Sequence, residues 1–232
     1  MISPKDILYE DNHLFILNKK VSEIVQGDKT GDISLDKKVK EFIKQRDNKP
    51  GNVYLGLPHR LDRPVSGVVV FTKTSKALTR MAEIFRDRKV EKIYHAIVKN
   101  KPDPSSAEII HFLKKNEKQN KSFVVGEKME GAKKAILEYR VLGGSDNYIL
   151  LEVQIHTGRH HQIRAQLSAM GCPVKGDLKY GFPRSNKNGG ISLHARSISF
   201  IHPVNNEVIT VTAPYPPEDI FEVFEKRGNM AG

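Results

Sequence analysis

The densest group of charged side chains lies in residues 57–67, which read LPHRLDRPVSG. Asp62 stands there between Arg60 and Arg63, directly ahead of an apolar run at residues 68–71. Nearby positive charge favours a carboxylate anion, so we expect Asp62 to be ionised. Polar groups that enter a core strand need partners. The segment is therefore either a site built on a carboxylate or a structural knot of salt bridges.

A second polar group occupies residues 156–164, which read HTGRHHQIR and open a predicted helix. A helix N-terminus presents backbone N–H groups that favour anions. Four polar side chains of this turn are Arg159, His160, Gln162 and Arg164. Because they cannot all point into a core, they form either an exposed, solvated first turn or a clamp for phosphate or carboxylate.

A third candidate is a tyrosine in residues 91–98, which read EKIYHAIV and predict a strand. Side chains alternate between the two faces of a strand. Tyr94 and Ala96 therefore share one face, and Ile93, His95 and Ile97 share the other. Tyr94 is either a core aromatic residue whose hydroxyl reaches the rim of the sheet or part of a site.

The elements that would position these residues follow from apolar spacing and capping residues. Strands are expected at residues 7–17 (a pair), 67–72, 93–98, 148–155, 191–200 and 207–212. Helices are expected after Ser34 up to Pro50-Gly51, after Thr74 or Ser75, and over residues 157–170 before Gly171. Surface loops are expected at residues 114–121 and 185–190. Strands outnumber helices without a regular βαβ alternation, which predicts an α+β fold on a largely antiparallel sheet.

Composition narrows the class of partner. The chain has 232 residues and a net charge of +11, and residues 61–140 carry 18 Lys and Arg against 10 Asp and Glu. A basic middle third suits a polyanion, although a generally basic, solvated surface is the alternative. There is one cysteine, Cys172, and no apolar leader or run long enough to span a membrane. We therefore expect an intracellular, cytoplasmic protein.

The three segments, in this order, resemble the motifs of pseudouridine synthases of the RluA family. Residues 59–63 with Ser66-Gly67 resemble the signature around the catalytic aspartate, and residues 92–98 resemble the strand that carries the active-site tyrosine. Residues 157–164 resemble the basic motif whose last arginine pairs with that aspartate. The likeness continues through residues 171–181, 193–195 and 200–203, and so covers almost the whole chain.

The resemblance implies a fold, a reaction and a site. The fold would be a mixed sheet in two halves flanked by helices, with a central basic cleft, as a single catalytic domain over residues 1–232 without a separate S4-type RNA-binding domain. The reaction would isomerise uridine to pseudouridine in structured ribosomal or transfer RNA. The protein would act as a monomer, and neither a metal nor a nucleotide cofactor would be needed.

The implied residue roles are specific. Asp62 would be the catalytic carboxylate, Arg164 would pair with it, and Tyr94 would stack on the base and assist proton removal. Arg60 would occupy the gap left by the flipped uridine or hold its flanking phosphates. Further RNA or substrate contacts would come from Arg63, Arg159, His161, Gln162 and Ile163.

Two departures from the family pattern and three competing functions remain. Many relatives begin with a separate S4-type RNA-binding domain, which we do not expect here because the matched pattern starts at about residue 7. Family members usually carry a Lys-Pro-x-Gly turn where this chain has KKVS at residues 19–22. The competing functions are a non-catalytic RNA-binding or assembly protein on the same fold, a hydrolase or glycosylase that releases free base, and a pure interaction module. The joint presence of Asp62, Tyr94 and Arg164 argues against binding alone.

Overall fold

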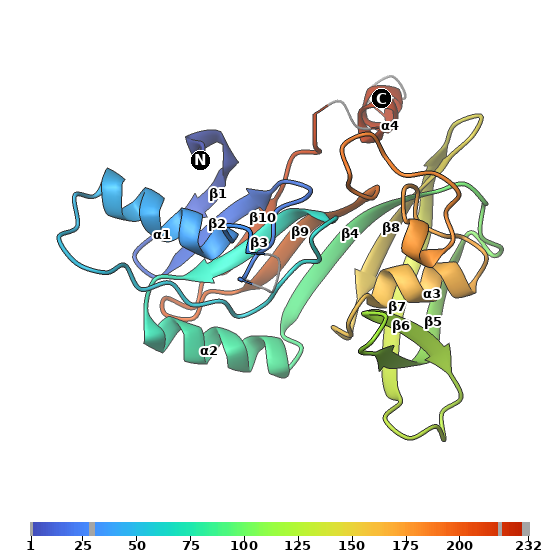
Figure 1. The fold of residues 1–232 in the computed structure, drawn as a ribbon, viewed down its shortest axis with the longest axis horizontal. Helices are drawn as coiled ribbons and strands as arrows, with labels where there is room; N and C mark the ends of the chain where they lie inside the picture. Colours follow the sequence, from blue (N-terminus) through green and yellow to red (C-terminus); the bar gives the residue numbers. More distant parts are fainter. Residues whose placement is uncertain (1, 28–30, 218–219, 229–232) are drawn as a thin grey trace. The chain divides into compact units, whose positions relative to one another are not determined.

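The computed structural model describes residues 2–27, 31–217 and 220–228. It divides into two compact units, each built on antiparallel strands with few helices (Figure 1). Unit 1 comprises Met1–Val90 and Arg196–Pro214, and unit 2 comprises Glu91–Ala195 and Tyr215–Gly232. The predicted α+β class with a largely antiparallel sheet is confirmed. The single catalytic domain and its central cleft stay predictions.

Unit 1 is a sheet with one helix on each face. Its elements are η1 (Pro4–Asp6), β1 (Ile7–Glu10), β2 (Leu14–Lys19), α1 (Leu35–Arg46), β3 (Ser66–Thr72), α2 (Ser75–Arg86), part of β9 (Leu193–Ile201) and β10 (Val208–Thr212). Strands β1, β2 and β3 run antiparallel in that order, and β10 pairs antiparallel with β9. Phe15 contacts Phe42 of α1, while its neighbour Ile16 packs in the cluster that contains Met81 of α2.

Packing on both faces explains the composition of β3. All seven of its residues are buried, as its continuous apolar run predicts. The helices around it also follow their sequence signals. Thr74 caps α2 by accepting a hydrogen bond from the backbone N–H of Ala77 at 3.2 Å. Helix α1 buries Leu35, Val39 and Ile43 but ends at Arg46, before the expected Pro50-Gly51 terminus.

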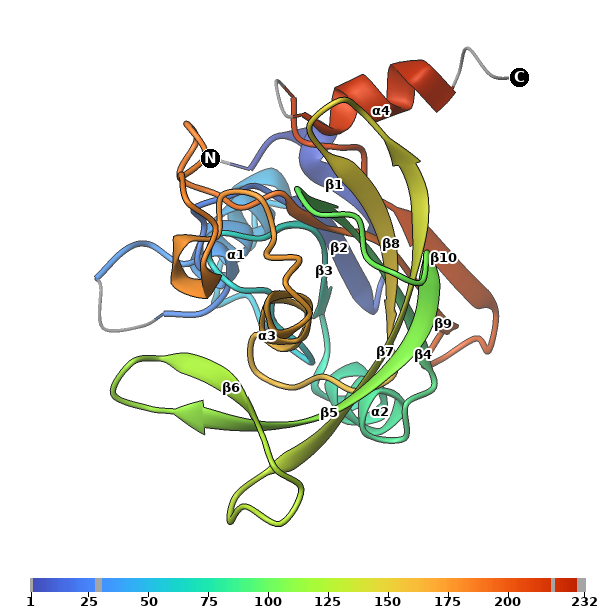
Figure 2. The ribbon, with the colours of Figure 1, turned by 90° about the vertical axis from the view of Figure 1, so that its right-hand side faces the viewer.

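Unit 2 is a curved sheet that carries a helix on each face. Its strands are β4 (Val90–Val98, from Glu91 on), β5 (Ser106–Asn116), β6 (Lys121–Val125), β7 (Lys133–Gly144) and β8 (Ile149–Ile155), with η2 (Leu178–Tyr180) and the helices α3 (Gln162–Ala169) and α4 (Phe221–Gly228). The order is β4-β8-β7-β5-β6, and all neighbours are antiparallel. The strands bend around α3 (Figure 2).

The two faces of the unit 2 sheet have different covers. Ala165 of α3 packs with Leu113 and Ala135 on one face. Phe221 and Phe224 of α4 pack with Ile97 and Leu150 on the other. Among the described residues, no helix has the length and apolar character needed to cross a membrane.

Three predictions about unit 2 need correction. The helix expected over residues 157–170 begins only at Gln162, because Thr157 Oγ1 and the Arg159 N–H both donate to the Gln162 side chain and fold residues 157–161 into a turn. The loop expected at residues 114–121 is a hairpin, with a turn only at residues 117–120. Strands β5, β6 and β7 were not predicted, since lysines and exposed positions obscure their alternation.

Segment 57–62 is tied to β3 at a glycine. The backbone of Gly56 exchanges two hydrogen bonds with Thr72 of β3, at 2.8 and 2.9 Å. A Cβ at Gly56 would collide with Thr72 Oγ1 and would lie 2.9 Å from Leu78 Cδ2. Only glycine therefore allows this close approach.

We expect Gly56→Ala to lower the free energy of unfolding by about 1–3 kcal/mol, because the side chains of Thr72 and Leu78 must move to admit the methyl group. Chemical denaturation would measure the change. Gly126→Ala is the matched control, since nothing lies within 4 Å of its added Cβ. Equal stability of the two variants would contradict the close approach.

Candidate active site

Asp62 lies on a short turn that leads into β3. The Val65 N–H donates to the Asp62 carbonyl at 3.1 Å and closes the turn. Leu61 and Val65 are buried on either side, and Asp62 itself is half-buried. The backbone of Asp62 is thus fixed between two buried neighbours.

A buried lysine holds the backbone of this turn. Lys19, at the end of β2, is 1% exposed, and its Nζ donates to the carbonyls of Lys20, Arg63 and Val65 at 3.0, 3.1 and 2.6 Å. Burial lowers the pKa of Lys19 to about 7, although the charges of Glu23 and Asp62 act in the opposite direction. We did not identify Lys19 as a site residue from the sequence. The available signal was a charged residue at the end of the apolar run of β2.

The turn after β2 contributes a further contact. The Ser22 N–H donates to the Arg63 carbonyl at 3.0 Å. Ser22 has a φ of 67°, a left-handed conformation that favours glycine. It occupies the glycine position of the family's Lys-Pro-x-Gly turn. At the proline position, the Lys20 N–H donates to Glu23 at 3.3 Å, which a proline could not do.

The two arginines that flank Asp62 in sequence are both exposed. Arg60 donates to the Gln26 side chain at 3.2 Å. Arg63 forms an ion pair with Asp32 at 2.9 Å, with the two side chains 48% and 49% exposed. Exposed ion pairs contribute little stability, so the Arg63–Asp32 pair adds little to the stability of the segment. Both guanidinium groups lie where a phosphate could meet them.

Arg164 in unit 2 is buried in a two-bond pair. Its Nε and Nη2 donate to the two carboxylate oxygens of Asp177 at 2.7 and 2.9 Å. Arg164 and Asp177 are 4% and 1% exposed, so the expectation of a solvated first turn is wrong here. Such a pair fixes the plane of a guanidinium. Sequence reasoning missed Asp177, whose signal was its place in the matched stretch 171–181. The Arg164 pairing with Asp62 stays a prediction.

The neighbours of Arg164 form an uncharged network. His161 Nδ1 lies 3.0 Å from the Tyr180 hydroxyl, which also accepts the Ser122 N–H at 2.9 Å. Burial, followed by the charge of Arg164, lowers the pKa of His161 to about 2. His161 is therefore neutral at ordinary pH and cannot hold a phosphate by charge. The same contacts attach strand β6 to the start of α3.

The other residues predicted in this motif divide into buried and half-buried ones. Gln162 is buried, accepts the Arg159 N–H and donates to the Ile136 carbonyl at 3.0 Å. Ile163 is 5% exposed and belongs to the buried side of α3. Arg159 is half-buried and donates through Nε to the Lys134 carbonyl at 2.9 Å. Only Arg159 presents a charge to solvent.

Tyr94 lies on the face of the sheet that α3 covers. It pairs with Val153 of β8, and Ala96 pairs with Leu151, on the side that includes Ala135 in the α3 cluster. The predicted alternation of β4 is confirmed. Tyr94 is half-buried, on the face of the unit 2 sheet that is covered by α3, the helix that carries Arg164.

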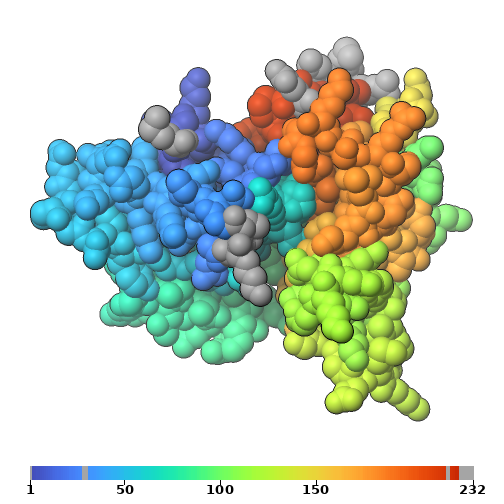
Figure 3. All heavy atoms as spheres, viewed as in Figure 1, coloured from blue at the N-terminus to red at the C-terminus, as the bar shows by residue number. Residues whose placement is uncertain are grey.

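Basic side chains gather on the β5–β6 hairpin and the chain that follows it. The lysines of this segment are Lys114, Lys115, Lys118, Lys121, Lys128, Lys133 and Lys134, and all except the half-buried Lys121 are exposed. Segment 114–134 lies at the surface, in green to yellow-green (Figure 3). Three glutamates accompany these seven lysines. The segment is thus a basic surface of unit 2.

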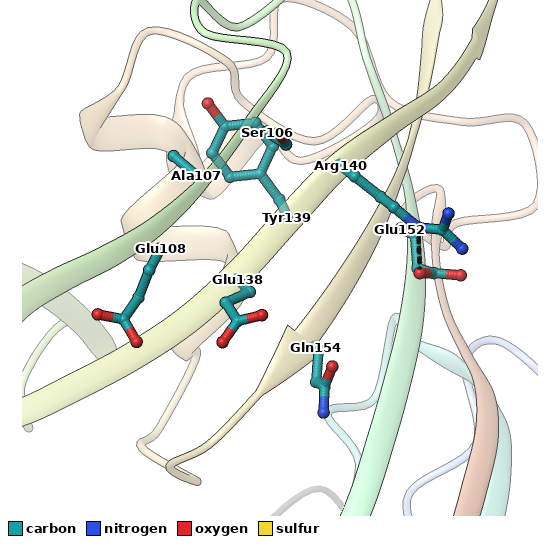
Figure 4. A pocket seen from close by; sticks show the side chains of 8 residues that line it. All are labelled: Ser106, Ala107, Glu108, Glu138, Tyr139, Arg140, Glu152 and Gln154. Atoms are coloured by element: carbon teal, nitrogen blue, oxygen red, sulfur yellow. Dashed lines mark hydrogen bonds and ion pairs between the residues drawn. The ribbon is translucent and has the colours of Figure 1, made fainter.

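A hollow of about 370 Å³ on unit 2 has the opposite character. Its lining residues are Ser106, Ala107, Glu108, Glu138, Tyr139, Arg140, Glu152 and Gln154 (Figure 4). Three carboxylates face one arginine, and Arg140 already pairs with Glu152 at 2.6 Å. Such a hollow repels a polyanion. Among the described residues, no group of three or more His, Cys, Asp or Glu is arranged to hold a metal ion.

Known proteins resemble this chain in sequence and in fold. A family model described as RNA pseudouridylate synthase matches residues 13–169. An uncharacterized RNA pseudouridine synthase of Synechocystis is 34% identical, over 92% of this chain and 66% of that protein. Ribosomal large subunit pseudouridine synthase C of Buchnera aphidicola is 32% identical, over 90% and 66%. tRNA pseudouridine synthase C of Vibrio parahaemolyticus is 27% identical, over 90% and 89%.

A solved structure extends the likeness to the fold. The human RNA pseudouridylate synthase domain containing 4 is 25% identical, with a TM-score of 0.79 over 96% of this chain and 93% of that one. The chain spans about half to two thirds of the length of several curated relatives that it matches.

The buried ammonium of Lys19 should make stability depend on pH. The unfolded chain keeps this proton up to about pH 10.5, whereas the folded protein releases it above about 7. The unfolded state therefore binds more protons in between, and the free energy of unfolding should rise with pH over this window. Lys19→Met should remove this rise, as measured by urea denaturation at several pH values. The exposed Lys20→Met is the control, and a parallel response of Lys19→Met and wild type would contradict the assignment.

The left-handed backbone at Ser22 predicts a difference between two variants that both lack the hydroxyl. Ser22→Gly should be more stable than Ser22→Ala by about 1 kcal/mol, because only the alanine retains a Cβ in this conformation. Thermal unfolding would measure it. The control is the exposed loop residue Ser185, where the alanine variant should be at least as stable as the glycine variant. If the glycine variant were the more stable one at both positions, the φ of Ser22 would not explain the difference.

Proposed function

Because the chain belongs to the RNA pseudouridylate synthase family, in its RluA branch, we propose that it converts uridine in RNA to pseudouridine. The observation that carries the proposal is the turn that contains Asp62. Lys19 holds this turn by donating hydrogen bonds to the carbonyls of Arg63 and Val65. A binding protein has no need for a carboxylate fixed in this way. An isomerase that acts at a single carbon of a sugar needs a carboxylate in a fixed position, because reacting groups must be held in the correct geometry.

The proposed reaction breaks the N1–C1′ bond of uridine and joins C5 of the same base to C1′. The proton of C5 leaves to water, N1 gains one, and the formula of the nucleoside does not change. Asp62 acts either as a nucleophile on the sugar or as the base that starts glycal formation. Both routes need its carboxylate ionised and held beside the sugar.

Tyr94 and Arg164 complete the proposed set. Tyr94 stacks on the base and assists removal of the C5 proton. Arg164 pairs with Asp62, as the family resemblance implies, and Asp177 orients the guanidinium for this role. Asp177 thus acts as a positioning residue. The neutral His161 and the buried Gln162 and Ile163 support the start of α3, and their contacts with RNA or substrate remain part of the proposal.

RNA is the proposed substrate because the exposed charges are positive where the site residues lie. Arg60, Arg63, Arg159 and the lysines of segment 114–134 would neutralise phosphates. The names of two relatives specify the large ribosomal subunit and tRNA, and we extend that pair of structured substrates to this chain. A stacked uridine must first leave its stack, at a cost of a few kcal/mol that phosphate contacts would offset. The proposal includes a cytoplasmic monomer that works without a nucleotide cofactor.

Release of tritium from RNA labelled at uridine C5 tests the reaction. Wild-type protein should release tritium without an added cofactor, and Asp62→Asn should reduce the rate by about 10²- to 10⁴-fold, because the carboxylate is lost at the reacting sugar. Asp146→Asn, at an exposed bend, is the control and should retain the rate.

Other outcomes separate the competing functions. Full release by Asp62→Asn would refute its catalytic role. Appearance of free uracil would identify a glycosylase. Salt-sensitive RNA binding without any release, on RNA known to lack the modification, would favour a binding or assembly protein.

A further inference from the structure

His59 has a contact that neither the reaction nor RNA binding explains. The backbone N–H of Val70, within the buried strand β3, donates to His59 Nε2 at 2.9 Å. Thr72, two residues further along the strand, directs its N–H to the carbonyl of Gly56. N–H groups two residues apart point to the same edge of a strand. After Gly56 the chain leaves this edge of β3 and supplies no backbone carbonyl to Val70. The imidazole of His59 accepts the Val70 N–H in place of that carbonyl.

This contact specifies the state of the ring. An imidazole nitrogen accepts a hydrogen bond only when it carries no proton, so Nε2 must be unprotonated and the neutral ring must carry its proton on Nδ1. Gln has an amide oxygen at a similar distance from the backbone and could also accept. Phe could not.

A second contact fixes the plane of the ring. His59 stacks on Phe85 in the last turn of α2, with ring centroids 4.8 Å apart and an angle of 21° between the planes. Offset or near-parallel stacking of this kind adds to the energy of area burial. The imidazole is thus held between a strand and a helix.

The constrained ring lies three residues before Asp62. Beyond Asp62, Lys19 holds the carbonyls of Arg63 and Val65. The segment that carries the carboxylate is therefore attached to the core of unit 1 at both ends. A displacement of about 1 Å at a reacting group can reduce a rate by roughly 100-fold.

From this arrangement we propose that His59 is a positioning residue, which sets the place of the Asp62 carboxylate by accepting the Val70 N–H. It does not contact RNA in this role. The inference rests on the proposed function, because one of its tests measures the rate of RNA modification. A second test, by hydrogen exchange, depends only on the hydrogen bond between Val70 and His59.

The kinetic test compares His59→Phe, which keeps a ring beside Phe85, with His59→Gln, which keeps an acceptor. On RNA that wild type modifies, His59→Phe should lower kcat by roughly 10- to 100-fold with little change in KM, because the reacting group is misplaced while RNA contacts remain. His59→Gln should recover most of kcat. Phe85→Leu, with the acceptor intact, should lie near wild type.

Hydrogen exchange of the Val70 amide, followed by NMR, supplies a readout that needs no activity. Exchange should accelerate by at least about tenfold in His59→Phe and stay near the wild-type rate in His59→Gln, because an amide hydrogen bond contributes about 1.4 kcal/mol, a factor of ten. The amide of Val68 in the same strand is the internal control and should keep its rate.

Each outcome decides the proposal. Wild-type kcat in His59→Phe, or equal loss in both variants, would overturn it. If wild type itself failed to modify RNA, the proposed function would fall, and unchanged Val70 exchange in His59→Phe would separately refute the anchor. If His59→Phe did not fold, His59→Gln would decide, since it must retain both kcat and Val70 protection.

Discussion

The site depends on one constraint: the carboxylate of Asp62 must be held next to β3, a strand that is buried on both faces. Strand β3 has no exposed position for Asp62, so the residue must lie on the turn just before it. The backbone groups of that turn then enter the core and need partners. A buried ammonium meets this need, because Lys19 supplies several donors from one point and binds carbonyls of residues that differ from it by more than 40 positions.

The charge of Lys19 is expensive to bury, and its depressed pKa reflects that cost. The same cost argues for function, because a hydrophobic residue would fill the space with less penalty. A lysine keeps the turn attached through its carbonyls without using any side chain of the turn itself. Arg60 and Arg63 remain exposed, and Asp62 half-buried, beside the turn that Lys19 holds.

Unit 2 also buries a charged side chain, and there the charge is paired with a carboxylate. Arg164 and Asp177 are both almost fully buried, and their two hydrogen bonds fix the guanidinium plane. Around them, Tyr180 joins His161 of the turn before α3 to Ser122 of β6. Burial keeps His161 neutral, so the network adds no second charge beside Arg164. Lys121 of segment 114–134 places its Nζ 4.9 Å from the centre of the Tyr180 ring, whereas the other lysines of that segment are exposed.

The sequence by itself determined the parts that depend on local pattern. The apolar run of β3, the alternation that places Tyr94, the Thr74 cap of α2 and the order of three motifs are all properties of neighbouring residues. They were sufficient for the α+β class, the family and the position of Asp62 ahead of a buried strand. The hairpin of β5 and β6 escaped because its exposed lysines give little apolar period.

Only the tertiary structure decided which distant groups meet. Lys19 reaches Val65, Ser122 reaches Tyr180, and Arg164 reaches Asp177, and no periodicity connects the members of these pairs. The charge state of His161 and the acceptor role of His59 likewise follow from burial and from a partner that another element presents. Local residue patterns set which elements form, whereas desolvation and hydrogen-bond geometry, which act only after packing, set what each polar side chain in them does.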